Sequence, residues 1–182
     1  MNYLLSTAAL GISTLALGIS LWQGWALIEH NRLSVRPHVT GTPYLEGPGA
    51  RNGLYLVNLG LGPAILDSAT ISFDGTDYDL STDFWEDALV AIGVEPVCFI
   101  RSWLPVGAAI VVDQEIPLLA TNGSNMPLCL HESLKLLTEH RIELTLEYGS
   151  LYGETLSGLE TLELRSPRQD YARALQKLGA EH

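Results

Sequence analysis

Six of the 21 acidic residues of this chain lie close together in one short segment, and that segment is the first place where site chemistry is conceivable. Of 182 residues, 10 are Lys or Arg and 21 are Asp or Glu, so the formal net charge is -11. Residues 74–87 contain six of the acids and no base. The candidate carboxylates are Asp74, Asp77, Asp79 and Asp83. We expect a solvated acidic face here, with a Ca²⁺ site or a basic partner as the alternative, because carboxylate oxygens are the ligands that Ca²⁺ prefers.

Two observations weaken the cation reading of this acidic face. Asp74-Gly75 is already accounted for as a hairpin turn between two short apolar-polar segments. No calcium-loop pattern ending in a bidentate Glu accompanies the acids. We therefore expect the acidic face to be solvated, and a cation site is the less favoured interpretation.

The histidine and cysteine residues give weaker indications of a metal site than the acidic segment does. His131-Glu132 begins like the His-Glu-x-x-His helix of zinc proteases, but position 135 is Lys. The two cysteines, Cys98 and Cys129, exclude a four-cysteine zinc site. Both stand among apolar residues, so we expect buried free thiols, with a disulfide as the alternative if their Cα atoms lie within about 7 Å.

Enzymatic and nucleic-acid functions are not expected. The sequence contains no Gly-x-Ser-x-Gly elbow, phosphate loop or dinucleotide fingerprint. An acidic surface repels phosphate backbones, so nucleic acid is an unsuitable partner. We therefore predict no catalytic residue, no cofactor and no metal.

The first 28 residues carry none of the charge. Tyr3 to Ile28 is a mostly apolar run of 26 uncharged residues, and a helix of about 20 already crosses a hydrocarbon core of roughly 30 Å. A cleaved signal peptide is disfavoured because the run is too long and no base precedes it. We predict a transmembrane helix over residues 1–28, with Tyr3, Trp22 and Trp25 at the membrane interfaces.

The residues that follow this helix set its predicted orientation. Residues 29–36 are expected to form a juxtamembrane linker, in which Arg32 and Arg36 also lie at the membrane interface. The N-terminal side offers only the α-amino group, so the positive-inside rule predicts a cytoplasmic C-terminal domain. The opposite topology stays open, since two arginines are a modest bias.

The helix also contains an internal repeat of small residues, Ser-Thr-x-Ala-Leu-Gly-Ile in approximate form, at residues 6–12 and 13–19. A heptad seam of small residues lets two helix backbones approach closely, and a polar Gln can hydrogen-bond across the contact. We predict self-association or packing on another membrane subunit through this seam. Its members are Ser6, Ala9, Ser13, Ala16, Ser20 and Gln23.

Residues 37–165 are predicted to form an antiparallel β-domain. Turn sequences such as Asn52-Gly53 and Asp74-Gly75 separate short runs of strand character. Strict alternation over 142–148 predicts a strand with one buried and one wet face. The expected strands are 39–45, 54–59, 69–73, 77–80, 97–104, 109–112, 116–120, 142–148 and 159–164. Two short helices are expected at 82–92, capped by Thr82 or Asp83, and at 130–139.

A resemblance emerges from Asn58-Leu59-Gly60-Leu61-Gly62-Pro63-Ala64. It resembles uncharacterised bacterial single-pass membrane proteins that share an Asn-x-Gly-x-Gly-Pro-Ala strand, and it is similar to the Asn-x-Gly strand end of CARDB-like immunoglobulin domains. The resemblance covers about 30 residues and implies an immunoglobulin-like β-sandwich, an accessory role and the bacterial inner membrane. It implies no reaction. Physically, Gly60 and Gly62 permit a bulge or a positive φ, and Pro63 ends strand pairing.

The C-terminal segment, residues 166–182, is predicted to form a basic amphipathic helix. Its bases include Arg168, Arg173 and Lys177. Such a helix can lie on an anionic leaflet or pack on the chain's own acidic domain. Of the two tryptophans in the β-domain, Trp85 and Trp103, we expect burial, and an exposed one would be an interface anchor.

The fold class is therefore mainly β: an N-terminal transmembrane helix, an immunoglobulin-like antiparallel sandwich with short helical insertions, and a C-terminal helix. Our leading hypothesis is a non-enzymatic, single-pass membrane-anchored module that serves as an interaction or accessory subunit of a larger membrane complex. The alternative is a membrane-tethered sensor whose β-domain binds a ligand or cation.

Overall fold

The computed structural model describes residues 2–48, 50–122, 126–162, 164, 172–173 and 176–177. The chain divides into two compact units, one ending at Arg36 and the other beginning at Pro37.

The first unit is the single helix α1 (Asn2–Ser34). It has 33 residues, so its length is about 50 Å at 1.5 Å per residue. Within the described residues, one helical stretch, Ala9–Ser34, is long and apolar enough to cross a membrane. The predicted N-terminal apolar helix is thus confirmed, and its crossing of a membrane stays a prediction.

The helix continues through most of the segment expected to be a linker. Residues 29–34 contain no helix breaker, and Arg32 lies 3.7 Å from Glu29 one turn earlier. Pro37 is the first residue that cannot continue the helix, since its ring and missing N–H prevent the next turn. The boundary of the helix is therefore Ser34 rather than residue 28.

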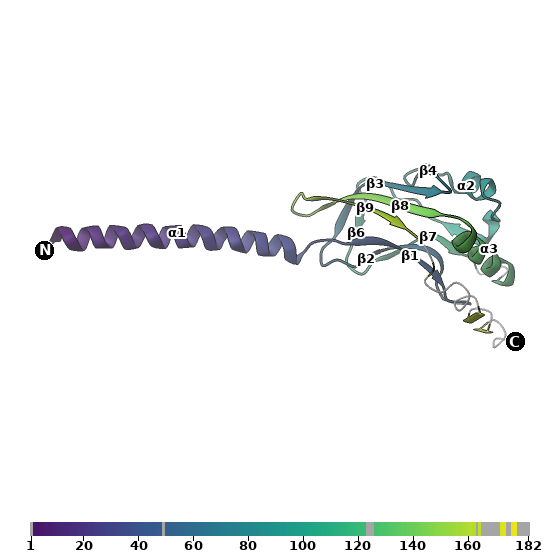
Figure 1. Ribbon diagram of the computed structural model, residues 1–182, viewed down its shortest axis with the longest axis horizontal. Coiled ribbons are helices and arrows are strands. Elements are labelled where there is room, and N and C mark those ends of the chain that lie inside the picture. The colour runs from purple at the N-terminus through teal and green to yellow at the C-terminus, as the bar shows by residue number, and fades with distance from the viewer. Residues whose placement is uncertain are drawn as a thin grey trace. The chain divides into compact units, whose positions relative to one another are not determined.

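The second unit holds two antiparallel sheets, and its described residues form nine strands (Figure 1). Sheet A has the order β1 (Val39–Leu45), β2 (Asn52–Asn58), β7 (Glu115–Thr121) and β5 (Phe99–Arg101). Sheet B has the order β4 (Thr76–Asp79), β3 (Ala64–Phe73), β8 (Ile142–Ser150) and β9 (Thr155–Thr161), and β6 (Ala109–Ile110) also pairs with β3. A mainly-β domain after an N-terminal helix is confirmed.

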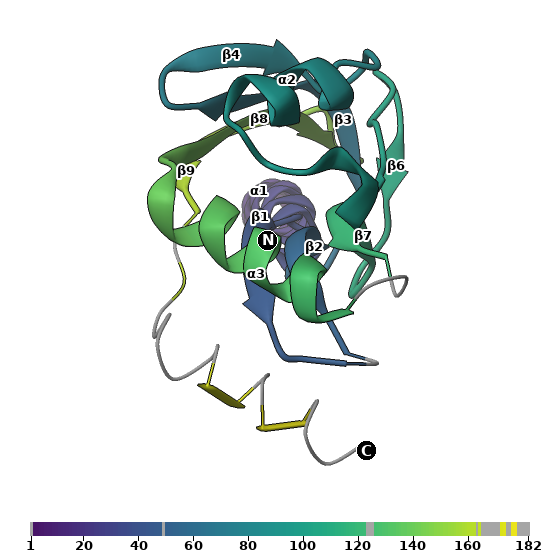
Figure 2. The same ribbon diagram turned by 90° about the vertical axis from the view of Figure 1, so that its right-hand side faces the viewer.

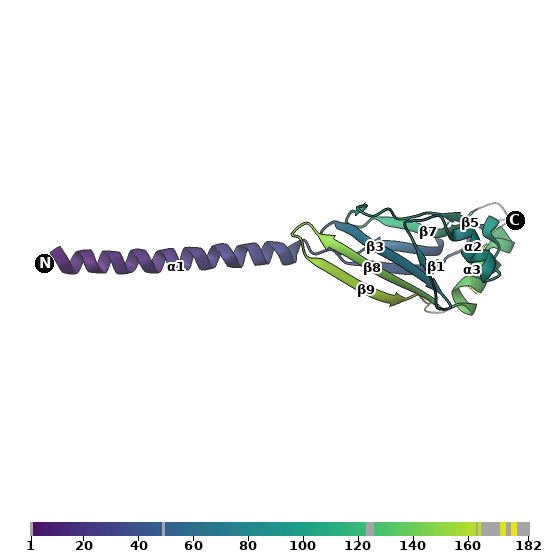
Figure 3. The same ribbon diagram turned by 90° about the horizontal axis from the view of Figure 1, so that it is seen from above.

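Two helices and a 3-10 turn lie near one end of this domain. They are α2 (Trp85–Ala91), η1 (Pro96–Cys98) and α3 (Met126–Glu139). Figure 3 shows α2 and α3 at the end opposite the turn between β8 and β9. In the end-on view of Figure 2, β3, β4 and β8 form one layer and β1, β2 and β7 the other.

The space between the layers is filled by one hydrophobic cluster drawn from both sheets and both helices. Strand β8 alternates as predicted, with Leu144 and Leu146 buried and the residues between them outward. Trp85 is completely buried against Phe73, and its indole N–H donates to the Ser102 carbonyl at 2.7 Å. This tryptophan anchors α2 to the core, because its large apolar ring and its polar N–H are both satisfied there.

Two expected local features are wrong. Asn52-Gly53 is not a turn but the start of β2, where the buried Asn52 side chain holds the preceding turn by accepting from the backbone N–H groups of Glu46 and Gly47. Neither Thr82 nor Asp83 caps α2, because the helix begins at Trp85 and Phe84 occupies the cap position.

The strand expected over 97–104 is also wrong in its extent. Pro96 starts η1, and only Phe99–Arg101 extends into β5. Pro at the first position favours a helical turn because its φ is already suited to one. By contrast, the Asp74-Gly75 hairpin is confirmed: both residues have positive φ, and Phe73 pairs with Thr76.

Candidate functional site

The acidic segment is spread over a turn, a strand and a loop rather than gathered around one point. Asp74 lies in the β3–β4 turn, where one carboxylate oxygen accepts from the Arg141 backbone N–H at 2.8 Å and the other lies 2.7 Å from His140 Nδ1. The hydrogen bond with His140, then the one from Arg141, lowers the pKa of Asp74 below its usual value. Asp74 thus ties the hairpin to the junction between α3 and β8.

The other three acids show no common focus. Asp79 accepts from the Ser81 backbone N–H at 2.8 Å, and this contact lowers its pKa. Asp77 points from the same exposed strand, and Asp83 is exposed in the following loop. Within the described residues no group of three or more His, Cys, Asp or Glu side chains is arranged to hold a metal. Two of the four carboxylates already serve local hydrogen bonds.

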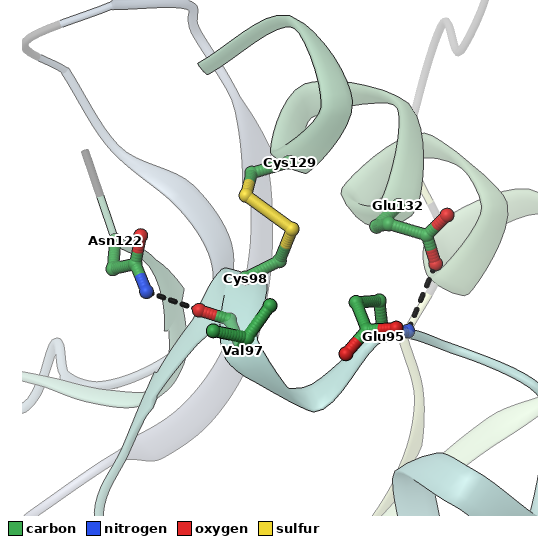
Figure 4. Close-up of a disulfide and its surroundings, with 6 residues drawn as sticks. All are labelled: Glu95, Val97, Cys98, Asn122, Cys129 and Glu132. Carbon is green, nitrogen blue, oxygen red and sulfur yellow. Dashed lines mark hydrogen bonds between the residues drawn. A yellow bond between two sulfur atoms is a disulfide. The ribbon is translucent and has the colours of Figure 1, made fainter. Parts of the chain in front are cut away.

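The cysteines form a disulfide, and the expectation of free thiols is wrong. Cys98 at the end of η1 is bonded to Cys129 in α3, with their Cα atoms 4.9 Å apart (Figure 4). Apolar neighbours alone could not distinguish the two states, since a buried disulfide and two buried thiols need the same surroundings. The disulfide forms because α3 packs against η1 and so brings the two cysteines within bonding distance.

The same face of α3 makes two further contacts with the segment before η1. Glu132 accepts from the Glu95 backbone N–H at 3.0 Å (Figure 4), and Lys135 donates to the Gly93 carbonyl. Cys129, Glu132 and Lys135 are spaced by three residues, so they share one helix face. In the His131-Glu132 pair, which resembled the start of a zinc motif, Glu132 therefore has a structural role. His131 is exposed.

The predicted seam of α1 lies on an exposed helix face. The hydroxyls of Ser13 and Ser20 donate to the carbonyls of Ala9 and Ala16, four residues earlier, at 2.8 and 2.9 Å. These bonds satisfy the hydroxyls within the helix, so the seam presents only small side chains to a neighbouring helix. Gln23 is exposed at its C-terminal end. Ser6, the remaining seam residue, is exposed one heptad before Ser13.

A second small-residue face of α1 was missed by the sequence interpretation. Thr7, Gly11, Thr14 and Gly18 line a shallow groove on the helix surface, together with larger residues such as Trp22. At 100° per residue this face lies roughly opposite the seam. The two faces offer two places where a partner helix could approach closely.

The predicted membrane-interface residues are exposed along α1. Tyr3 stands at the N-terminal end, and Trp22 and Trp25 stand about three turns before the helix ends. Arg32 falls within the last turn of α1, and Arg36 follows the helix. Because the helix runs on to Ser34, the two tryptophans are not at its very end.

Asn58, the first residue of the Asn-x-Gly-x-Gly-Pro-Ala segment, is the residue whose side chain holds the segment by hydrogen bonds. Its buried side-chain carbonyl accepts from the backbone N–H groups of His38 and Gly60, at 3.2 and 3.0 Å. Its amide nitrogen donates to the carbonyls of Gly62 and Ile110, each at 2.9 Å. All four hydrogen-bonding positions of this side chain are used.

The two glycines of that segment have a different role from the one expected. The described glycines with positive φ are elsewhere, for example Gly53 and Gly75, and neither Gly60 nor Gly62 is among them. The side chain of Asn58, rather than left-handed backbone, shapes the segment.

A charged cluster at the β1–β2 turn was not anticipated. Arg51 donates to Glu46 and to Glu115 on β7, each at 2.7 Å, and its guanidinium lies 3.8 Å above the ring of Tyr44. The hydrogen bond from Arg51 lowers the pKa of Glu46, and the partnership raises the pKa of Arg51. No spacing rule links residues 46, 51 and 115, so only the strand pairing could bring them together.

Trp103 is the exposed tryptophan of the β-domain. It is 57% exposed, and it follows β5, the edge strand of sheet A. Val97 and Ile100 are also exposed, so three apolar side chains stand out within seven residues. Trp85, the other tryptophan, is buried as expected.

The predicted C-terminal helix, residues 166–182, lies largely outside the described residues. Residues 172–173 and 176–177 are helical, and Lys177 Nζ donates to the Glu46 backbone carbonyl at 2.7 Å.

Comparison with known proteins finds no matching family model, no matching curated protein and no matching solved structure.

Proposed function

We propose that this chain is a non-enzymatic, single-pass membrane protein whose β-domain serves as an interaction or accessory-subunit module. The observation that carries the proposal is the exposed apolar group Val97, Ile100 and Trp103 beside the edge strand β5. An edge strand leaves unpaired backbone groups, and an exposed Trp is a frequent interface anchor. These side chains lie outside the buried cluster that forms the core of the domain.

The two antiparallel sheets with a shared core support the immunoglobulin-like interpretation of the fold. Domains of this architecture commonly act through exposed strands and loops rather than through a catalytic pocket. The resemblance of the Asn58 segment to single-pass bacterial proteins agrees with an accessory role in the inner membrane.

Helix α1 is proposed to contribute a second contact with the partner or with another copy of the chain. The satisfied hydroxyls of Ser13 and Ser20 keep the Ser/Ala seam compact, and Gln23 can hydrogen-bond across it. The lipid bilayer is the first partner of this helix.

Two observations disagree about the side of the membrane on which the β-domain lies. Arg32 and Arg36 favour a cytoplasmic β-domain. The Cys98–Cys129 disulfide favours an oxidising compartment, because cytosolic thiols are kept reduced. We propose the oxidising side, since a two-residue charge bias is weaker than a cross-link that the cytosol would not maintain.

Purification of the full chain from detergent-solubilised membranes through a C-terminal tag tests the interaction role. We expect a co-purifying protein in fixed ratio, lost in Trp103→Ser and kept in Leu159→Ser. Leu159 is a matched control, since it is exposed and apolar on the edge strand of the other sheet. A wild-type chain that purifies as a lone monomer contradicts the proposal.

A further inference from the structure

The end of the β-domain at which the chain enters from α1 carries a set of exposed apolar side chains. Three loops meet there: the β2–β3 loop, the β6–β7 loop and the β8–β9 turn. We call this set the apolar tip. Its members are Leu59, Leu61, Val111, Val112, Leu151 and Tyr152. Leu61 is 71% and Leu151 is 65% exposed.

Strand pairing places the three loops at the same end of the domain. Ala64, the first residue of β3, pairs with Ile110 on one side and with Ser150 on the other. The loops before Ala64, after Ile110 and after Ser150 therefore leave the sheet together. The Leu59 backbone N–H donates to the His38 carbonyl at 2.8 Å, so the entering chain also lies there. The β8–β9 turn and the start of β1 are at one end in Figures 1 and 3.

The backbone of the apolar tip satisfies many of its polar groups internally. Asn58 accepts from the Gly60 N–H and donates to the Gly62 carbonyl, as described above. In the β6–β7 loop, the Gln114 side chain accepts from the Val111 N–H at 2.9 Å, and the Asp113 N–H donates to the Asn58 carbonyl.

The β8–β9 turn follows the same arrangement. Ser150 Oγ accepts from the N–H groups of Tyr152 and Glu154, and the Gly153 N–H donates to the Ser150 carbonyl. Apolar side chains thus point outward while backbone groups are paired inward. The paired backbone groups lower the cost of moving this surface out of water, because unpaired polar groups are costly in lipid.

The length of chain before β1 indicates which occupant covers this surface. Beyond the predicted span, which ends at Ile28, the six helical residues Glu29–Ser34 rise about 9 Å. The five peptide steps from Ser34 to Val39, the start of β1, span at most about 18 Å more, so the connection keeps this end of the domain near the bilayer. A bilayer extends roughly 5–8 Å beyond its hydrocarbon core on each side. The three loops contain no Lys or Arg, and their two charged residues are the acids Asp113 and Glu154, so anionic headgroups are not the attraction.

We infer that the apolar tip inserts into the interfacial layer of the same bilayer that α1 spans, and so docks the β-domain on a lipid surface. The inference rests on the proposed membrane span of α1. Tyr152 suits this layer, because its ring is apolar and its hydroxyl polar.

The experiment uses the full chain in zwitterionic nanodiscs, with trifluoromethyl-phenylalanine placed singly at position 61, 151 or 97. Fluorine relaxation is measured with a nitroxide on the lipid acyl chain and, separately, with a water-soluble paramagnetic chelate. At positions 61 and 151 we expect the acyl nitroxide to act several-fold more strongly than the chelate. At position 97, on the opposite end of the domain, we expect the reverse.

A second set of variants separates insertion from simple nearness to the bilayer. With the probe at position 112, the double change Leu61→Glu and Leu151→Glu should reduce the acyl-chain effect several-fold, and Val90→Glu in α2 should not. All three side chains are exposed, so folding is not at stake, and an unchanged melting temperature checks this.

Three results would overturn the inference. Strong chelate relaxation at 61 and 151 means that the tip lies in water, and protection from both agents means that another copy of the chain covers it. No effect of the double change on the probe at 112 means that nearness alone explains the signal. If the protein is instead extracted from membranes by alkaline carbonate, the span of α1 itself fails, which is a separate result.

Discussion

Asn58 is a buried amide that joins four separate backbone segments at one point. Replacing it with Ala leaves the part-buried N–H group of His38, the buried N–H group of Gly60 and the buried carbonyls of Gly62 and Ile110 without this partner. We expect Asn58→Ala to lower the free energy of unfolding by about 2–4 kcal/mol, since each buried unpaired group costs about 1–3 kcal/mol and some regain water. Denaturant unfolding of the purified chain measures it.

Asn31→Ala, on the exposed face of α1, is the control for that substitution. Its effect should stay within about 0.5 kcal/mol, as is usual for surface positions. A loss at Asn58 no larger than this would show that the Asn58 contacts contribute little.

Asp74 should make the stability of the domain depend on pH. Its pKa is lowered in the folded state by His140 and Arg141, so the folded state favours the charged carboxylate. The contribution is present above the pKa of the unfolded state, and it is lost as pH falls through the lowered folded pKa. We expect the acid side of the melting-temperature profile to flatten in Asp74→Asn, which keeps a residue that tolerates positive φ.

Asp77→Asn serves as the control, since Asp77 is an exposed acid on the neighbouring strand. Its profile should follow that of the wild type. The difference between the two variants should be small and should shrink in high salt, because half-exposed ion pairs are screened. Identical profiles for all three proteins would contradict a role for Asp74.

At the scale of elements, the Cys98–Cys129 disulfide fixes α3 to η1. It closes a loop with a sequence separation of 31 residues, for which the chain-entropy estimate is about 3–4 kcal/mol of stabilisation. We expect a reductant to lower the melting temperature of the wild type and to leave Cys98→Ser/Cys129→Ser unchanged. A variant that still responds to reductant, or a wild type that does not, would contradict the cross-link.

Gly53 controls the pairing of β2 with β7. Its φ is 121°, and a Cβ there would overlap the Leu119 carbonyl oxygen on the neighbouring strand. We expect Gly53→Ala to cost about 3 kcal/mol or more, because both the backbone and the strand spacing must change. Gly158→Ala on β9 is the control, since open space surrounds it, and equal melting temperatures for the two variants would refute the argument.

Local patterns predicted the elements better than their contacts. The run 39–45, the Asp74-Gly75 hairpin and the alternation of β8 are features of adjacent residues, and each was predicted correctly. Asn52-Gly53 misled because the same dipeptide that forms turns also suits a crowded strand end. The disulfide and the Arg51 cluster join residues that only the tertiary fold brings together, so spacing could not reveal them.

At the scale of the whole molecule, the disulfide and the helix make the orientation testable. Denatured protein taken from acid-quenched cells should bind no polymer-linked maleimide before reduction and two after it. A reporter that is active only in an oxidising compartment, fused after His182, should then be active. Two reactive thiols without reduction, together with an inactive reporter, would place the domain in the cytoplasm, as Arg32 and Arg36 predict.

The order of strands in sheet B has a consequence for how this chain is made. Strand β3 pairs with β8, and even their nearest partners, Phe73 and Ile142, are 69 residues apart in sequence. During synthesis β3 must therefore wait for more than a third of the chain before its main neighbour exists. Non-local pairing of this kind slows folding and leaves a hydrophobic strand edge open to aggregation. If α1 spans the membrane as we propose, the chain spends this interval tethered, where it meets fewer copies of itself than it would in free solution.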